Sequence, residues 1–323
     1  MKNIWRMILF MVGTILLALT LAPYGTGIFR FLELPSGFRP LLMLLGGVHW
    51  MFALLLWRDI DRHVQNHLIN AFGISAVAVN LIEVAPWYTP RIRPTNSENP
   101  IEILVYNVTA SNQNYDKAIT YVQQEGTDVA IFLESAGEWP RNLARLKEDF
   151  PYHLPVQVAE FDIYSRHPIL RHKLHFFGDY RGFIECTINI DGIPYTVVAY
   201  HAYAGFYLGK RGFELRNEQL QRLTKMYRDT RERLIAMGSF NIDPWSPIYK
   251  RAMKDSGLFD ARKTFGPSPS CALTPRAYQF PWLARPIDTA IVSESVQIQE
   301  FRTGPFLGSR HLPLTLEILR EAE

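Results

Sequence analysis

The sequence has little that would indicate a disulfide-bonded domain, a zinc site or a nucleic-acid-binding protein. Only two cysteines occur in 323 residues, Cys186 and Cys271, and their spacing matches neither a metal site nor a disulfide framework. They could pair, but we interpret both as core residues. The formal net charge is only +3, and no long basic stretch is interleaved with aromatic residues, so nucleic acid is not favoured as a partner.

Apolar residues are concentrated before residue 90, so the two parts of the chain are expected to lie in different solvents. Three apolar runs cover residues 8–21, 41–57 and 68–87, and each approaches the roughly 20 residues that cross a bilayer as a helix. Aromatic residues suited to the headgroup level lie within or near the ends of these runs: Trp5, Trp50, Trp57, Trp87 and Tyr88. We therefore predict that residues 1–90 form a membrane anchor with about three transmembrane helices.

A cleaved signal peptide is the alternative interpretation of the first run. Residues 22–25, Ala-Pro-Tyr-Gly, form a poor cleavage site, and two more apolar runs follow, which favours a retained anchor. His49 and Glu83 could mark a function within the membrane. A position near a helix end, or a polar contact between helices, explains both residues more simply.

Basic residues do not decide the orientation of the anchor. With the N-terminus inside, the inner and outer segments carry equal numbers of basic residues, which are Lys2, Arg6, Arg58 and Arg62 against Arg30, Arg39, Arg91 and Arg93. Because the first helix usually dominates, we expect a cytoplasmic N-terminus, which places the soluble domain of this multi-pass membrane protein outside the cytoplasm. Residues 91–100 are rich in proline, asparagine and serine and are predicted to form a linker.

Residues 101–323 show the pattern of an α/β domain. Strand-like stretches cover residues 101–106, 129–133, 161–164, 183–190, 195–199, 234–237, 287–292 and 312–318. Asp191-Gly192 is typical of a hairpin turn, and helical spacing covers residues 115–124 and 213–233. Many strands with few helices predict a four-layer α/β sandwich, two packed mixed β-sheets flanked by helices.

The second predicted helix has one apolar face and one basic face. The basic face carries Arg222, Lys225, Arg228 and Arg231, and we interpret it as a solvated surface.

Polar side chains lie at the ends of several predicted strands, either where a strand stops or where one starts. They are Asn107, Glu134, His201, Asn241, Asp288 and His311. Each alone has an ordinary structural explanation, because an asparagine or aspartate after a strand is usually a turn former. Together they supply what hydrolysis of a phosphate ester needs. A carboxylate and an amide oxygen can hold Mg²⁺, and an imidazole oriented by an aspartate can act as acid or base.

These residues lie in short motifs that occur in one order along the chain. The motifs are Tyr106-Asn107-Val108, Phe132-Leu133-Glu134, Tyr164-Ser165-Arg166-His167-Pro168-Ile169, Tyr200-His201, Gly238-Ser239-Phe240-Asn241, Pro286-Ile287-Asp288 and Gly308-Ser309-Arg310-His311-Leu312-Pro313. In this order they resemble the endonuclease/exonuclease/phosphatase superfamily over nearly the whole soluble part. The resemblance implies the deoxyribonuclease I-like fold and a metal-dependent phosphoester hydrolase.

The resemblance also implies a role for each site residue. Glu134 corresponds to the principal metal ligand, with Asn107 beside it, and the cofactor would be Mg²⁺ or Mn²⁺. His201 and Asn241 correspond to donors to the phosphate. Asp288 corresponds to the residue that orients His311, whose imidazole would stabilise phosphoryl oxygens or transfer a proton.

Two positions depart from the family pattern. Ser239 replaces the aspartate of Gly-Asp-Phe-Asn, which usually aligns the attacking water, and Arg310 replaces the aspartate of Ser-Asp-His, which usually contributes to the metal site. The two changes add +1 and +2 to the charge of the site. A unit charge about 4 Å away is worth about 4 kcal/mol at an effective dielectric near 20. We expect weaker binding of a divalent cation and stronger binding of phosphate. Asp243 could replace the lost acid, although Asp-Pro is a common turn start.

We therefore predict a membrane-anchored phosphodiester hydrolase, with the lipid bilayer and a phosphorylated small molecule or lipid as partners. The alternative is a catalytically impaired domain of the same fold that binds a phosphorylated ligand. A structural membrane protein without a ligand would leave six site residues unexplained.

Overall fold

The computed structural model describes residues 2–55, 63–89, 97–178, 181–205, 208–263, 265–272 and 274–320. Most of the predicted linker at 91–100 lies outside the described residues. So do Trp57 and four of the basic residues weighed for orientation, Arg58, Arg62, Arg91 and Arg93.

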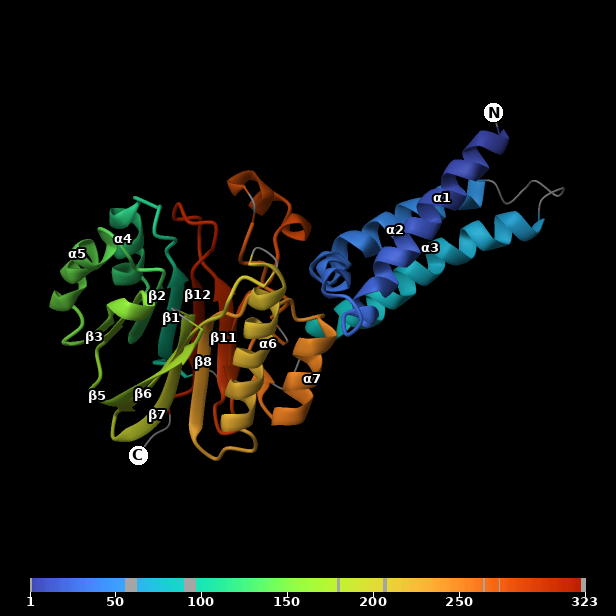
Figure 1. Cartoon of the computed structure of the whole chain (residues 1–323). Helices are drawn as coiled ribbons and strands as arrows, with labels where there is room; N and C mark the ends of the chain where they lie inside the picture. Colours follow the sequence, from blue (N-terminus) through green and yellow to red (C-terminus); the bar gives the residue numbers. More distant parts are fainter. Residues whose placement is uncertain are drawn as a thin grey trace.

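The N-terminal part forms a bundle of three long helices that projects from one end of the molecule (Figure 1). The helices are α1 (Lys2–Leu21), α2 (Arg39–Leu55) and α3 (His63–Val84). Three helical stretches, 3–25, 30–55 and 64–87, are long and apolar enough to cross a membrane by length and composition. The expectation of three possible spans is confirmed.

Polar residues inside the bundle contact the neighbouring helices. Nε2 of His49 lies 2.9 Å from the carbonyl oxygen of Leu9, and the Asn80 amide donates to Thr20 Oγ1 at 3.0 Å. A Cβ at Gly13 would lie 2.8 Å from the His49 ring, so the close approach of α1 requires glycine there. His49 therefore has the interhelical contact that explains it without a function in the membrane.

The remainder folds into two six-stranded mixed sheets. The first has the order β11-β12-β1-β2-β4-β3, with β1 (Ile101–Asn107), β2 (Val129–Leu133), β3 (Tyr152–Val156), β4 (Phe161–Ser165), β11 (Ile298–Thr303) and β12 (Leu314–Ile318). The second has the order β5-β6-β7-β8-β10-β9, with β5 (Ile169–Phe177), β6 (Arg181–Ile190), β7 (Ile193–His201), β8 (Arg233–Ser239), β9 (Phe259–Asp260) and β10 (Asp288–Val292).

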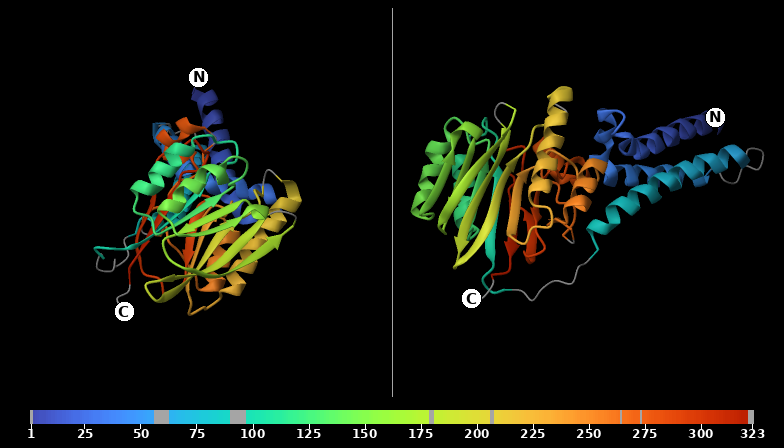
Figure 2. Two further views of the ribbon diagram at one scale, coloured as in Figure 1. Left: turned by 90° about the vertical axis from the view of Figure 1, so that its left-hand side faces the viewer. Right: turned by 60° about the horizontal axis from the view of Figure 1, so that its bottom comes forward.

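Helices cover the outer face of each sheet, which gives four layers (Figure 2). The first sheet is covered by α4 (Tyr115–Gln124), α5 (Trp139–Leu143) and η5 (Ala144–Glu148), and the second by α6 (Gly209–Met226) and α7 (Pro247–Ser256). The predicted fold class is confirmed.

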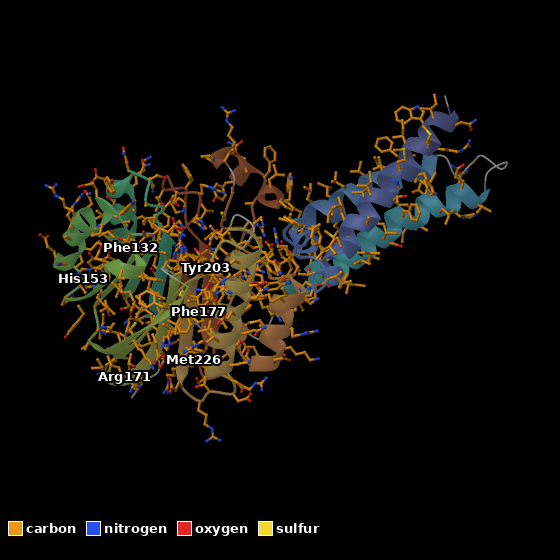
Figure 3. All side chains as sticks on the ribbon, viewed as in Figure 1. Phe132, His153, Arg171, Phe177, Tyr203 and Met226 are labelled. Carbon is orange, nitrogen blue, oxygen red and sulfur yellow. The ribbon has the colours of Figure 1, made fainter. Side chains whose placement is uncertain are left out.

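Alternation along the strands fills three hydrophobic cores. Residues such as Ile131 and Met237 pack between the sheets, whereas their neighbours Phe132 and Ala236 face the helices outside. Figure 3 labels Phe132 in one outer core and Phe177 and Tyr203 in the other. Both faces of each central strand are therefore buried.

One local prediction differs from the structure, and another is confirmed. The helix predicted over residues 213–233 ends at Met226, and Arg233 already begins β8. Asp229 adopts a left-handed backbone (φ 50°) that cannot continue a helix, so the apolar run after it belongs to the strand. The predicted hairpin turn is confirmed, since Asp191 and Gly192 have φ of 51° and 84°.

The bundle docks onto the second sheet's helices through a short segment between α1 and α2. This segment contains η1 (Ala22–Gly25) and η2 (Arg30–Phe38). Glu33 in η2 forms an ion pair with Arg216 of α6 at 2.8 Å, and both side chains are about 1% exposed. Arg216 Nη1 also donates to the carbonyl oxygen of Asn241 at 3.1 Å, so the N-terminal bundle is joined to the loop after β8.

A second contact holds the end of the third helix. The carboxylate of Glu83 accepts hydrogen bonds from Lys250 Nζ at 2.8 and 2.9 Å, and its carbonyl oxygen accepts from Trp245 Nε1 at 3.1 Å. The Trp87 and Trp245 rings pack edge to face with 6.3 Å between their centroids. Helix α7 begins in this contact, with Ser246 as its cap and Pro247 at its first position.

Glu33→Gln should destabilise the junction strongly. Removing one partner of a buried ion pair leaves the other charge uncompensated and costs about 3–5 kcal/mol. We expect a lower midpoint of thermal unfolding for the full chain, measured by tryptophan fluorescence. Glu138→Gln is the matched control, because the Glu138–Arg141 pair is exposed and exposed pairs contribute about 0–1 kcal/mol. Equal midpoints for the two variants would show that the buried pair contributes no more to stability than the exposed pair.

Candidate functional site

The six predicted site residues lie at one edge of the two packed sheets. Strands β1 and β2 are parallel, and β7 and β8 are parallel, so their carboxyl ends share an edge. Asn107 ends β1, Glu134 follows β2, and His201 and Ser239 end β7 and β8. Asp288 begins the antiparallel strand β10 directly opposite Ser239.

Two site residues have strained backbones and one neighbouring position requires glycine. Glu134 and Asn241 have φ of 57° and 52°, a left-handed conformation that is uncommon for side chains other than glycine. A Cβ at Gly238 would lie 1.9 Å from the carbonyl oxygen of Tyr200, so only glycine lets β7 and β8 approach here. The strain is concentrated where the chain leaves these strands.

Asn107 connects the two sheets at the centre of the site. Its Nδ2 donates to Glu134 Oε1 at 3.1 Å and to Ser239 Oγ at 3.2 Å. Ser309 Oγ donates to the carbonyl oxygen of Asn107 at 2.7 Å and accepts from the His311 backbone N–H at 3.0 Å. The loop that carries His311 is therefore fixed to the end of β1.

Glu134 lies between two groups that favour its ionised form. His201 Nε2 is 3.2 Å and Arg181 Nη2 is 3.8 Å from Oε1. Burial alone would raise the pKa of Glu134, but the hydrogen bond from His201 and the nearby positive charges hold it well below its ordinary value. This carboxylate is ionised throughout the neutral range.

His201 is buried and neutral. Burial and then the charge of Arg181 lower its pKa to about 4, against the opposing effect of Glu134. Arg181 also contacts the ring nitrogens of His201. Because an ionised carboxylate only accepts, Nε2 of His201 carries the proton towards Glu134.

His311 forms the opposite kind of pair. Its Nδ1 lies 2.8 Å from Asp288 Oδ2. Although burial would lower the pKa of His311, the charge of Asp288 raises it well above its ordinary value, and the pKa of Asp288 is correspondingly lowered. His201 is thus a neutral imidazole, and His311 at the same edge is a positively charged imidazolium.

Asn241 and the two cysteines complete the description of the expected residues. Asn241 Nδ2 donates to the carbonyl oxygen of Ala202 at 2.8 Å, so part of its amide holds the loop rather than facing a ligand. Cys186 is a core residue, as expected. Cys271 is half-buried instead, with Sγ 3.8 Å from His311 Nε2, and it lies beside the site.

The two departures from the family motif have different environments. Ser239 is buried at the centre of the site, whereas Arg310 is exposed and its carbonyl oxygen accepts hydrogen bonds from Ala272 N–H and Tyr278 Oη. The guanidinium found beside Glu134 belongs to Arg181, at the start of β6. The sequence does not single out Arg181, because it precedes the predicted strand at 183–190 and lies in none of the family motifs. Asp243 pairs with Arg285 at the anchor junction, away from Glu134.

The donor set fits one cation with few protein ligands. Glu134, about 24% exposed, offers the carboxylate oxygens that Mg²⁺ and Mn²⁺ prefer, and Mg²⁺ commonly binds through one or two carboxylates while keeping several waters. Asn107 directs its Nδ2 towards Glu134, and its Oδ1 accepts from the Thr109 backbone N–H at 3.1 Å. Within the described residues, no group of three or more histidines, cysteines, aspartates or glutamates could hold a metal. The adjacent charge of Arg181 further weakens cation binding.

Comparison with known proteins agrees with this geometry. The model of the Endonuclease/Exonuclease/phosphatase family matches residues 104–311, which is well over half of the chain. The chain belongs to this family. The family resemblance expected from the motifs is confirmed, and the family's activity supports a phosphoester hydrolase in general. No curated protein matches the sequence.

Several solved structures have the same fold as this chain at low sequence identity. D. rerio TDP2, complexed with a single-strand DNA product, has a TM-score of 0.57 at 14% identity, and 69% of this chain covers 100% of that one. An endonuclease/exonuclease/phosphatase from Beutenbergia cavernae has 0.55 at 17%, with 68% and 72% covered. A family protein from Bacteroides thetaiotaomicron has 0.54 at 14%, with 70% and 100% covered.

Asp288→Asn should move the pH dependence of anion binding. Binding through protonated His311 is present below its raised pKa and is lost as the pH rises through that value. Without the aspartate, the pH at which anion binding is lost should shift down towards 6.5, the ordinary pKa of histidine. Calorimetric titration with dimethyl phosphate, whose charge is constant across this range, measures the shift. Asp116→Asn, in an exposed pair, should leave the profile unchanged. An unshifted profile in Asp288→Asn would contradict the pairing.

Arg181→Gln should strengthen cation binding and weaken anion binding. The guanidinium is close to Glu134 and partly exposed, so we expect roughly a tenfold change in each dissociation constant after solvent screening. Electron paramagnetic resonance of Mn²⁺ and calorimetry with dimethyl phosphate measure the two effects. Arg141→Gln, an exposed residue of α5, is the charge-matched control. Opposite changes in the two dissociation constants, or no change, would contradict the electrostatic effect assigned to Arg181.

Proposed function

We propose that this chain is a membrane-anchored hydrolase of phosphodiester bonds that acts on a phosphorylated lipid and uses Mg²⁺ or Mn²⁺. The observation that carries the proposal is the pairing of an ionised Glu134–Asn107 cluster with a protonated His311–Asp288 pair at one sheet edge. The first offers oxygen ligands to a cation, and the second offers a donor to phosphoryl oxygens.

Each residue then has a definite task. A bound cation would neutralise charge that develops on the phosphoryl group, and Glu134 and Asn107 would hold it. His311, kept protonated by Asp288, donates to a phosphoryl oxygen or protonates the departing oxygen. Arg181 supplies a fixed positive charge beside them, and Ser239 fills the position from which the family's aspartate would align water.

An exposed aromatic loop next to the site supports a lipid substrate. Residues 275–283, named here the aromatic loop, contain η7 (Pro275–Gln279) and η8 (Pro281–Leu283). Phe280, Trp282 and Leu283 are each 40–46% exposed, and η8 contacts α2 of the anchor. Apolar side chains exposed beside a membrane helix suit the bilayer surface, where tryptophan is enriched.

The chain reaches the aromatic loop from Cys271, which lies beside His311. The backbone of Cys271 forms isolated antiparallel β-bridges with His311 and with Arg285. Tyr278 Oη donates to the carbonyl oxygen of Arg310. A lipid whose headgroup reaches the site would therefore pass the aromatic loop. We place the soluble domain outside the cytoplasm, following the weight of the first helix; protease protection in oriented vesicles tests that placement.

The second candidate function is binding of a phosphorylated ligand without turnover. Ser239 in place of an acid and Arg181 beside the single metal-site carboxylate both favour an anion over a cation. Nucleic acid is not favoured, because the net charge is small.

A phosphodiester assay separates the two candidates. The full chain is assayed with bis-p-nitrophenyl phosphate in Mg²⁺, in Mn²⁺ and in chelator, beside Glu134→Gln and Ser239→Asp/Arg310→Asp. The enzyme account expects metal-dependent turnover that falls at least 100-fold in Glu134→Gln, since electrostatic groups of this kind contribute about 10²–10³ in rate. Glu138→Gln is the matched control. An inactive native chain, with turnover appearing in the double variant, would establish the binding function instead.

A further inference from the structure

A second candidate site lies at the junction of the anchor and the soluble domain, away from the catalytic edge. It is a cavity of about 480 Å³ between η1 and the two helices α6 and α7. Tyr24 and Thr26 line it on the anchor side, and Lys225, Arg228, Arg251 and Asp255 line it on the domain side. We call it the junction groove. Met226, labelled in Figure 3, marks the end of α6 that forms part of its wall.

Three cations face one carboxylate in the junction groove. Lys225, Arg228 and Arg251 are all exposed, and within the described residues no ion pair joins any of them to an acidic side chain. Arg228 Nε donates to the backbone carbonyl of Asp255 at 2.7 Å, which leaves its terminal nitrogens for another acceptor. The groove therefore has an excess of positive charge and an excess of hydrogen-bond donors.

The anchor wall of the junction groove is held in place. Tyr24 Oη donates to Glu83 Oε1 at 2.7 Å, and the same carboxylate accepts from Lys250 of α7. Thr26 is buried, with its hydroxyl donating to the carbonyl oxygen of Pro23. Because these bonds join η1, α3 and α7, the groove exists without a ligand and needs little reorganisation on binding.

The position of the junction groove indicates what could reach it. Tyr24 lies at the end of the first candidate span, 3–25, and Glu83 lies near the end of the third, 64–87. Both spans therefore end beside this cavity, and the bundle meets α7 at the same end of the molecule (Figure 1). If the spans cross a bilayer, the groove lies at the level of the lipid headgroups.

We propose that the junction groove binds the phosphate headgroup of an anionic phospholipid from the adjacent leaflet. Arginine guanidinium groups match phosphate oxygens in pairs, and lysine adds a point charge. Basic residues just outside a membrane helix attract anionic lipids. This assignment gives a ligand to Lys225 and Arg228, two of the four basic residues for which the sequence alone indicated only a solvated surface. It rests on the anchor crossing the membrane and not on the proposed hydrolysis.

The test measures lipid binding to the full chain in a nonionic detergent by native mass spectrometry. The probes are phosphatidylglycerol, phosphatidylcholine and glycerol phosphate. Lys225→Gln/Arg251→Gln should weaken phosphatidylglycerol binding about 25-fold, from roughly fivefold per basic residue. Asp255→Asn should strengthen it several-fold, which a merely structural role would not do. Arg141→Gln/Lys147→Gln removes one arginine and one lysine from the exposed surface of the distant helices α5 and η5, and it should have no effect.

Each outcome decides the proposal. Preference for phosphatidylglycerol over phosphatidylcholine, lost only in the groove variant, supports it. Equal binding of the two lipids, or equal loss in both double variants, would overturn it. Glycerol phosphate binding as tightly as the lipid would also overturn it, in favour of a site for soluble phosphates. Because none of these readouts involves turnover, failure here is distinguishable from failure of the proposed hydrolase.

Discussion

The site depends on the parallel pairing of two central strands in each sheet. Parallel pairs β1–β2 and β7–β8 end at the same edge, and packing of the sheets brings these two edges together. The hydrogen bond from Asn107 to Ser239 then joins the sheets at 3.2 Å. Without this packing, Glu134 and His201, which come from different sheets, would not form a hydrogen bond.

The N-terminal helical bundle is attached to the same region rather than merely tethered to the domain. Arg216 pairs with Glu33 of η2 and also donates to the backbone of Asn241 in the site loop. Ser246, which caps α7, donates to the same carboxylate of Glu33. One buried ion pair therefore fixes three elements, and any movement of the anchor would act on the loop after β8.

Much of the fold and most of the site could be predicted from the sequence. Short apolar runs ending in polar residues located Asn107, Glu134 and His201, because strand ends share an edge, whereas Asp288 starts its strand and was located by its family motif. Arg181 could not be found this way, since it starts a strand and approaches Glu134 only after the sheets pack. The Glu33–Arg216 pair was equally hidden, because its partners are 183 positions apart.

Cleavage of a lipid phosphodiester by this site is the property to measure first. The full chain should be reconstituted in vesicles of phospholipid, and release of the water-soluble headgroup product should be followed with Mg²⁺ or Mn²⁺ present. The account predicts release that continues in Glu138→Gln and stops in Glu134→Gln. Release that persists unchanged in Glu134→Gln, or no release from any phosphodiester lipid, would contradict it.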